Sequence, residues 1–235
     1  MWHPLLSELE GYYRQLDGIF SRLKMRYPQE ISCRRGCNHC CQHLVDIYLS
    51  EALLLNLHCR SLKRKKRRAL ERRAALHLKA LERRVGEREL CLEEEALQGR
   101  AQRLQGFRLL CPLNEQGDCL LYEARPAICR IYGLLLADGR KGTFSHCTQN
   151  FRRLSPGQVV EAVPLDEVME AISRLDRRLL MELGGKAPPA LQKVYIGTAL
   201  TTDFEGLSWQ SLVLELSSLP GRQAAGGGVV KVSDV

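Results

Sequence analysis

The sequence predicts a mainly α-helical protein with a small α+β core that is rich in cysteine. Apolar residues recur at helical spacing over residues 3–26 and again over residues 166–183, with charged residues between them. No glycine or proline interrupts residues 51–85, which therefore also predict helix. In contrast, two short apolar runs flank the turn residues Asn114–Asp118 and predict a small hairpin. Helices thus dominate the chain, and the hairpin belongs to its cysteine-rich part.

The N-terminal part should alternate between helix and short connecting segments. The helix over residues 3–26 ends before Pro28, and the first cysteines follow it. The apolar and β-branched run Leu44–Leu49 predicts a strand. Ser50 and Glu51 then predict the start of a helix.

Residues 51–105 are predicted to form a long, basic helical insertion. It begins with one long helix, or with two helices that break at Ser61, and a further helix is expected over Glu87–Leu104. Residues 60–88 hold 13 Lys or Arg against three Glu, a local charge of +10 in a protein of net charge +8. The rest of the chain sums to −2, so the basic character belongs to this segment.

The chain divides into three predicted parts. The first, residues 1–158, is a cysteine-cluster metal-binding domain that contains the insertion and a short helix opening at Pro126. The second is a helical C-terminal part over residues 159–220, in which Leu207–Leu219 is expected to be helical. Residues 221–235 contain three consecutive glycines and predict a flexible tail.

Eight of the ten cysteines form two groups and are the candidate metal ligands. They are Cys33, Cys37, Cys40 and Cys41, followed by Cys111, Cys119, Cys129 and Cys147. Gaps of two or three residues in the first group let a tight loop donate several sulfurs, and Gly36 permits the positive φ that such a loop needs. Thiolates select zinc, copper(I) or iron–sulfur clusters. Cys59 and Cys91 lack cysteine neighbours and are predicted to be structural thiols on helices.

The adjacent pair Cys40 and Cys41 is difficult to reconcile with a single metal ion. On an extended backbone, neighbouring side chains point to opposite faces, so the two sulfurs would strain to bind one ion. Either one of them binds a second metal or the site is polynuclear. Eight sulfurs fit two sites of four thiolates, or one site with bridging or spare thiolates.

Basic and imidazole side chains accompany the cysteines in the sequence. The nearby arginines are Arg34, Arg35, Arg125 and Arg130. We expect them to keep thiolates deprotonated and to compensate the negative charge of a thiolate-bound metal, with chance placement in an arginine-rich chain as the alternative. His39, His43 and His146 are weaker ligand candidates than the cysteines. His146 is expected to be the best placed of them because it adjoins Cys147.

The arrangement of these residues resembles a known family. Cys33-x3-Cys37-x2-Cys40-Cys41, then Cys111-Pro112, then Cys119-x2-Tyr122-x2-Arg125-Pro126-x2-Cys129-Arg130, is similar to the YkgJ-type cysteine-cluster family, described as a zinc- or iron-chelating domain. The similar pieces cover residues 33–50 and 107–150. The resemblance implies an eight-cysteine metal site at the positions above and a kinship with flagellin lysine methylases. The 69-residue gap between the two cysteine groups is long for the family core, so the role of the insertion stays open.

The cysteine pattern favours an iron–sulfur cluster protein of redox or protein-modification type. The enzyme classes left open are an iron–sulfur oxidoreductase and a flagellin-methylase-like activity, acting on an unknown protein or small molecule. The alternative is a structural zinc module. Such a module could also associate with nucleic acid through the basic helix 60–88. No Phe, Tyr or Trp lies between Arg60 and Arg88, so a base-stacking surface is not indicated there. Nucleotide-binding loops, HExxH and GxSxG are absent from the sequence, so no catalytic residue is predicted.

The first ten residues lack the basic start and the apolar run of a signal peptide. No run approaches the roughly 18 apolar residues of a membrane span. We therefore expect a cytoplasmic protein that does not associate with membranes and whose thiols stay reduced or bind metal.

Overall fold

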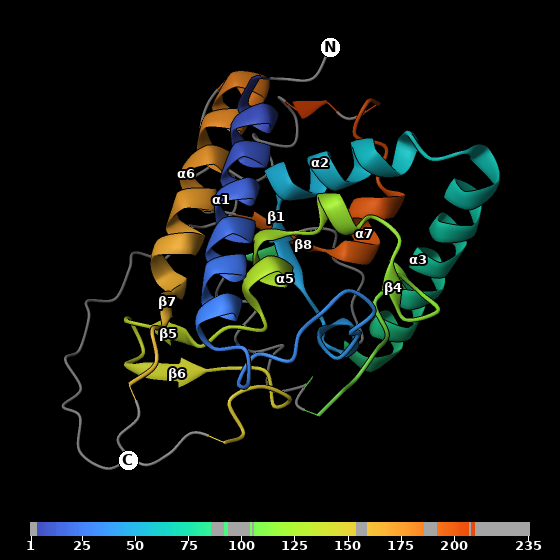
Figure 1. Ribbon diagram of the computed structural model, residues 1–235. Helices are drawn as coiled ribbons and strands as arrows, with labels where there is room; N and C mark the ends of the chain where they lie inside the picture. The colour runs from blue at the N-terminus through green and yellow to red at the C-terminus, as the bar shows by residue number, and fades with distance from the viewer. Residues whose placement is uncertain are drawn as a thin grey trace.

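The computed structural model describes residues 4–85, 92–93, 104, 106–153, 159–185, 192–206 and 208–209. This part of the chain is mainly helical, which confirms the predicted class (Figure 1). The helices are α1 (Pro4–Arg26), α2 (Leu49–Arg60), α3 (Arg64–Val85), α5 (Ala127–Ile131), α6 (Leu165–Gly184) and α7 (Ile196–Thr201), with two 3₁₀ turns, η1 (Cys40–Gln42) and η2 (Tyr122–Ala124). The strands are β1 (Asp46–Tyr48), β2 (Leu92–Glu93), β3 (Asn114–Glu115), β4 (Asp118–Cys119), β5 (Leu136–Asp138), β6 (Thr143–Ser145), β7 (Val163–Pro164) and β8 (Gln192–Tyr195).

Two long helices, α1 and α6, lie side by side and form one side of the molecule (Figure 1). Leu9, Leu16 and Leu23 of α1 recur every seventh residue and are buried together with Ile172 and Leu179 of α6. Each helix ends near its predicted boundary. Both predicted amphipathic helices are therefore confirmed, and they supply much of the first hydrophobic core.

A second core lies between α2, α3, α7 and strands β1 and β8. It buries Leu55 of α2, Leu70 and Ala74 of α3, and Ala199 of α7. The two-helix reading of residues 51–85 is the correct one, because α2 ends at Arg60 and α3 begins at Arg64. The segment that we expected to be an insertion thus contributes side chains to the core of the protein.

The predicted helix over Glu87–Leu104 is wrong at Leu92–Glu93. These residues form strand β2, which pairs antiparallel with β8, where Leu92 faces Lys193. The strand order of this sheet is β1-β8-β2. Helical spacing of a few leucines is a weak preference, and pairing with a strand that lies about 100 positions away overrides it. Apart from Leu104, the rest of that segment, including Cys91, lies outside the described residues.

The hairpin predicted around Asn114–Asp118 is confirmed. Strands β3 and β4 pair antiparallel through a two-residue turn, in which Gln116 and Gly117 have φ values of 54° and 95°. Two positive φ values in a two-residue loop match the twist of a hairpin. The Gly117 N–H also donates to Asn114 Oδ1 at 3.2 Å.

Strands β5, β6 and β7 form a third small sheet, in the order β6-β5-β7, beneath α1 and α6 (Figure 1). Strand β7 leads directly into α6, so residues on both sides of position 158 share one sheet. The predicted helix Leu207–Leu219 and the predicted tail lie outside the described residues, except for Ser208 and Trp209. None of the described helices is both long enough and apolar enough to span a membrane.

Candidate metal centre

The eight predicted cysteines meet in one place. All of them line one cavity of about 740 Å³, although they come from two parts of the chain that are 69 residues apart. Cys59 is buried in the second core and does not line this cavity. Burial raises the pKa of Cys59 to about 11, which is typical of an unreactive structural thiol. The predicted division between ligand candidates and a structural Cys59 therefore agrees with their positions.

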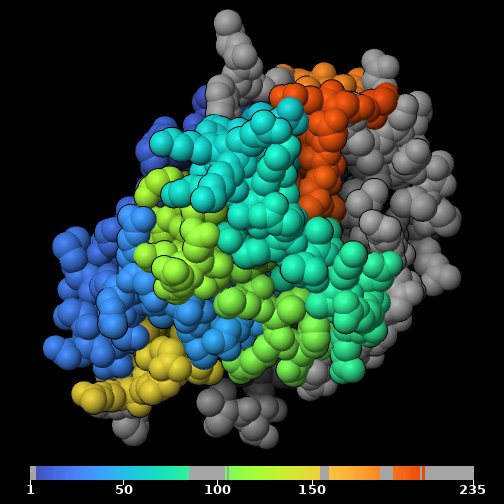
Figure 2. Space-filling model, turned by 90° about the vertical axis from the view of Figure 1, so that its right-hand side faces the viewer, coloured from blue at the N-terminus to red at the C-terminus, as the bar shows by residue number. Residues whose placement is uncertain are grey.

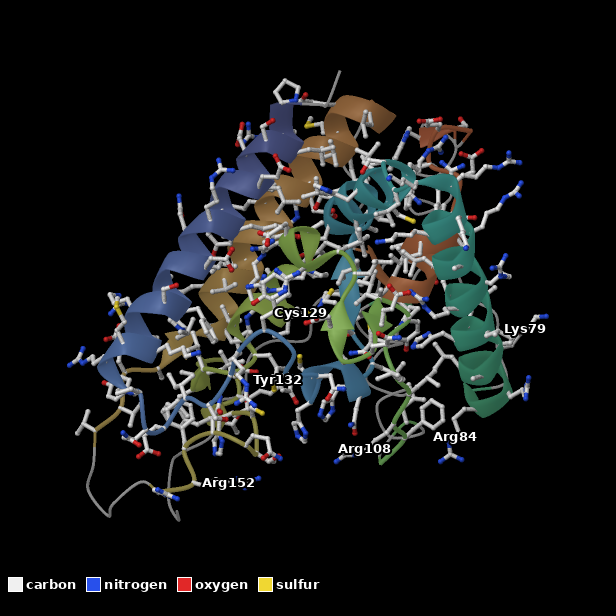
Figure 3. All side chains as sticks on the ribbon, turned by 45° about the vertical axis from the view of Figure 1, so that its right-hand side comes forward. Lys79, Arg84, Arg108, Cys129, Tyr132 and Arg152 are labelled. Atoms are coloured by element: carbon white, nitrogen blue, oxygen red, sulfur yellow. The ribbon has the colours of Figure 1, made fainter. Side chains whose placement is uncertain are left out.

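Short, irregular elements carry the sulfurs. Cys33 and Cys37 lie in the loop after α1, Cys40 and Cys41 in η1, and Cys111 and Cys119 at the β3–β4 hairpin; Cys129 lies in α5, and Cys147 follows β6. Figure 3 shows Cys129 near the middle of the molecule, with Tyr132 beside it and α1 and α3 on opposite sides. The long helices thus frame the cavity, and the connections between them supply its sulfurs.

The loop of the first group turns at Gly36, which has the expected positive φ, 84°. The Cys37 N–H donates to the Arg34 carbonyl at 3.0 Å and closes this turn. The expectation of an extended backbone at Cys40 and Cys41 is wrong, because both residues lie in the 3₁₀ turn η1. Successive side chains of a 3₁₀ helix project about 120° apart. The two thiols are close enough to shift each other's pKa, and the Cys41 sulfur also lies near the Asn114 amide.

The two cysteine groups are joined through their backbones. The Cys111 N–H donates to the Cys41 carbonyl at 2.7 Å, and the Asn114 N–H donates to the Cys111 carbonyl at 2.9 Å. Asn114 is paired with Cys119 across the hairpin. These bonds place the hairpin directly against η1.

A buried carboxylate, Glu51, positions the helix that carries Cys129. Glu51 Oε1 accepts hydrogen bonds from the Tyr13 hydroxyl and from the Ala127 N–H, both at 2.9 Å. Its Oε2 accepts the Tyr48 N–H at 3.2 Å. A negative group at these free N–H donors stabilises the first turns of α2 and α5 together. Sequence reasoning assigned Glu51 only to the start of α2.

Cys33 is held by a side chain that the sequence gave no reason to select. Asn150 is fully buried, and its Nδ2 donates to the Cys33 sulfur at 3.2 Å and to the Gly133 carbonyl. Its Oδ1 accepts from the backbone N–H and the hydroxyl of Ser32 at 3.0 and 2.8 Å. A Cβ at Gly133 would lie 2.5 Å from the Cys33 sulfur, so a side chain there would force the Cys33 thiol or the backbone to move. The position of Asn150 three residues after Cys147 is the one signal that could have indicated it.

Burial and mutual proximity shift the pKa values of several thiols that line the cavity. Burial, together with the neighbouring thiols, raises the pKa of Cys111 to about 12 and that of Cys119 to about 11, and it raises the pKa of Cys129 well above its ordinary value. The pKa of Cys41 is instead lowered to about 6, first by the Cys40 thiol that donates to it and also by the Asn114 amide. The Asn114 Nδ2 faces this sulfur without reaching hydrogen-bond geometry. Of these four thiols, Cys41 therefore loses its proton most readily.

The four predicted arginines all line the cavity. Arg130 is buried, and it pairs with Asp17 and lies over the Tyr13 ring. Arg125 pairs with the other Asp17 oxygen at 2.8 Å, so this carboxylate already balances part of their charge. Arg34 and Arg35 are exposed, and Arg35 approaches Asp118 only to 4.0 Å. Compensation of a metal centre by these arginines stays a prediction.

Of the three histidines, His39 and His43 line the cavity, and His146 does not. The expectation that His146 is the best placed is wrong. His146 is exposed while the adjacent Cys147 is buried, and its Nδ1 lies 3.0 Å from the Cys147 carbonyl oxygen. His39 Nε2 lies 3.0 Å from the Thr148 hydroxyl. Adjacency to Cys147 therefore did not predict the position of His146, because the Cys147 side chain is buried and the His146 side chain points to solvent.

The donors share a cavity without forming a ready ligand shell. Within the described ranges, no three His, Cys, Asp or Glu side chains stand in an arrangement that could hold an ion. A cysteine sulfur moves when χ1 rotates from one staggered position to another. Closing a shell around a metal therefore requires rotation of thiols that already line the same cavity.

No protein-family model, curated protein or solved structure matches the chain. The resemblance to the YkgJ-type family consequently depends on the quoted cysteine, proline and arginine positions alone. The chemistry of the cavity has to be argued from its side chains.

Proposed function

We propose that the protein binds metal through Cys33, Cys37, Cys40, Cys41, Cys111, Cys119, Cys129 and Cys147, most simply as an iron–sulfur cluster protein of redox or protein-modification type. One observation carries the proposal: eight cysteines from distant parts of the sequence line one cavity, and the cysteine that was predicted to be structural does not. Unrelated buried thiols have no reason to converge in this way. Thiolates are the ligands of iron–sulfur clusters and of zinc.

Two features support iron–sulfur over a lone zinc ion. The cavity of about 740 Å³ has room for a polynuclear centre and for a molecule beside it. Its wall also includes apolar and aromatic side chains, among them Phe20, Met25 and Tyr132. Apolar surroundings and hydrogen bonds to sulfur, such as that of Asn150 to Cys33, are the means by which proteins adjust cluster potentials.

A structural zinc module is the second candidate, and the small size of the sulfur-bearing elements favours it. Strands β3 and β4 have two residues each, η1 has three and α5 has five. Elements this short are stabilised by a metal that joins them. Zinc would then hold the hairpin, η1 and α5 together without taking part in a reaction.

Nucleic-acid binding through α3 is not favoured. Figure 2 shows α3 lying against the chain around the hairpin, and part of its charge is used there, since Arg73 donates to the Pro112 carbonyl at 3.0 Å and pairs with Glu115 at 2.9 Å. Lys65, Lys66 and Arg68 are exposed and remain available to phosphates.

Anaerobic purification with elemental analysis and a visible spectrum tests the proposal. Iron with acid-labile sulfide and broad visible absorbance is expected for a cluster. A colourless protein with stoichiometric zinc would select the structural module. A protein that retains neither metal, and that takes up neither when reduced and reconstituted, would contradict metal binding altogether.

A further inference from the structure

We propose that the cavity holds two metal centres, one bound by Cys33, Cys37, Cys40 and Cys147 and the other by Cys41, Cys111, Cys119 and Cys129. This inference rests on the proposed metal binding and adds the number of centres and the ligands of each. The sequence alone left one eight-sulfur site and two four-sulfur sites equally open.

The first set is defined by contacts around Asn150 and Tyr132. Cys33 lies within electrostatic range of both Cys37 and Cys147. Asn150 connects the two ends of the set, since its side chain donates to the Cys33 sulfur and its backbone N–H donates to the Cys147 carbonyl at 2.8 Å. The Tyr132 hydroxyl lies within electrostatic range of Cys33, Cys40 and Cys147.

The second set is defined by the hairpin. The backbone N–H of Cys111 donates a hydrogen bond to the Cys41 carbonyl. Cys119 of β4 is paired directly with Asn114 of β3 across the hairpin. Cys129 reaches this set from α5 and lies within electrostatic range of Cys41, Cys111 and Cys119. None of the described interactions joins Cys33 or Cys147 to Cys111 or Cys119.

The adjacent pair at the start of η1 divides the sets. The 3₁₀ turn directs the two side chains about 120° apart. Cys40 stands at the boundary, within electrostatic range of Cys37 of the first set and of Cys41 and Cys129 of the second, whereas Cys41 lies near the Asn114 amide of the second set. The Asn114 Nδ2 is a buried donor with no partner, and a metal-bound thiolate at Cys41 would satisfy it.

Charge also favours two separate centres. Four thiolates around a divalent ion carry about −2, and an oxidised four-iron cluster with four thiolates carries the same charge. Each set has its own cation nearby: the Lys24 ammonium donates to the Cys33 carbonyl, and Arg125 lies within electrostatic range of Cys119. Eight thiolates around one ion would concentrate far more negative charge in one place.

Titration of the reduced, metal-free full chain with cobalt(II) under anaerobic conditions counts the centres. Cobalt(II) in a tetrathiolate site has intense visible absorbance, so the titration has a sharp end point. We expect the absorbance to saturate at two equivalents per chain. Cys59→Ser, which leaves the cavity unchanged, should also saturate at two equivalents.

Matched variants assign the ligands. Cys37→Ser in the first set and Cys119→Ser in the second should each saturate at one equivalent, and the double variant should bind none tightly. Circular dichroism of each variant confirms that the helices are retained. If a variant does not fold, the end point of the wild-type chain still decides the number of centres.

The outcomes separate the two proposals. An end point at one equivalent, or loss of all cobalt binding in either single variant, would overturn the two-centre inference and leave metal binding intact. A wild-type chain that binds no cobalt, iron or zinc would overturn metal binding itself and the two centres with it.

Discussion

Asn150 donates a hydrogen bond from Nδ2 to the sulfur of Cys33 at 3.2 Å, across 117 positions of the sequence. The same amide group bonds the Gly133 carbonyl, and its oxygen accepts two bonds from Ser32. One buried side chain therefore connects the first cysteine loop to the segment that carries Cys147. A bond from an amide to sulfur favours the thiolate form, which is the form that binds metal.

Asn150→Ala should both destabilise the protein and weaken metal retention. The substitution leaves the Ser32 N–H and the Gly133 carbonyl without partners, at a cost of about 2–3 kcal/mol. Denaturant unfolding measures the stability, and the metal content after a fixed exposure to a chelator measures retention. Gln149→Ala changes an exposed neighbouring side chain and is the control that should alter neither quantity. Unchanged retention in the Asn150 variant would show that this bond does not support a ligand.

Replacing a cavity cysteine should differ from replacing the core cysteine. Cys37→Ser and Cys129→Ser should each lower the metal content and the solubility, because each removes a sulfur from the cavity. Cys59→Ser should change neither, because Cys59 lies in the second core. Metal analysis of the three purified variants checks this. Equal metal loss in all three would show that the division of the cysteines is wrong.

Gly133→Ala should disturb the site because the new Cβ would lie 2.5 Å from the Cys33 sulfur. We expect lower metal content and a destabilisation of about 1–3 kcal/mol from overpacking. Gly18→Ala is the matched control: Gly18 lies within α1, and a Cβ there meets nothing within 4 Å. The control should gain about 1 kcal/mol from helix propensity. Equal stability and metal content in the two variants would contradict the packing seen at Gly133.

Asp176 should make stability depend on pH. Burial raises the pKa of Asp176 from 3.8 to about 7, even though its Oδ1 accepts the Ser50 N–H at 2.6 Å, and the nearby Glu51 raises it further. Between about pH 4 and pH 7 the native state then binds a proton that the unfolded state has released, so stability falls as the pH rises. The total loss is at most about 4 kcal/mol.

Asp176→Asn should remove this dependence. Denaturant unfolding of both proteins at pH 5 and pH 8 measures their free energies of unfolding. Subtracting the value of the variant from that of the wild-type protein at each pH removes the contribution of groups that titrate alike in both. We expect the wild-type protein to lose stability relative to the variant on going from pH 5 to pH 8. A constant difference would mean that Asp176 does not titrate in this range.

The parts of the fold that could be predicted are those with a local cause. The spacing of Leu9, Leu16 and Leu23 defines α1 without reference to the rest of the chain, and the turn residues of the hairpin define β3 and β4. Strand β2 could not be predicted, because its two residues are a strand only in the presence of β8.

In the candidate site, too, only the residues with a local sequence pattern could be predicted. The cysteines could be selected because clustering and spacing are visible in the sequence. The contacts of Asn150, Gly133 and Glu51 with the cysteine-bearing segments join residues 17 to 117 positions apart, so no local pattern marks them. His146 shows the converse error, since it is close to a ligand candidate in sequence but turned away from the cavity.

The cavity draws its eight thiols from the loop after α1, from η1, from the hairpin, from α5 and from the segment after β6. Contacts between such distant segments form late, after the long helices and their local contacts. Until these segments meet, a newly made chain therefore carries eight unprotected thiols. Folding in air would oxidise these thiols to mismatched disulfides, which thiol–disulfide exchange would then interconvert. The yield of correctly folded protein would therefore depend on adding a reductant before the metal.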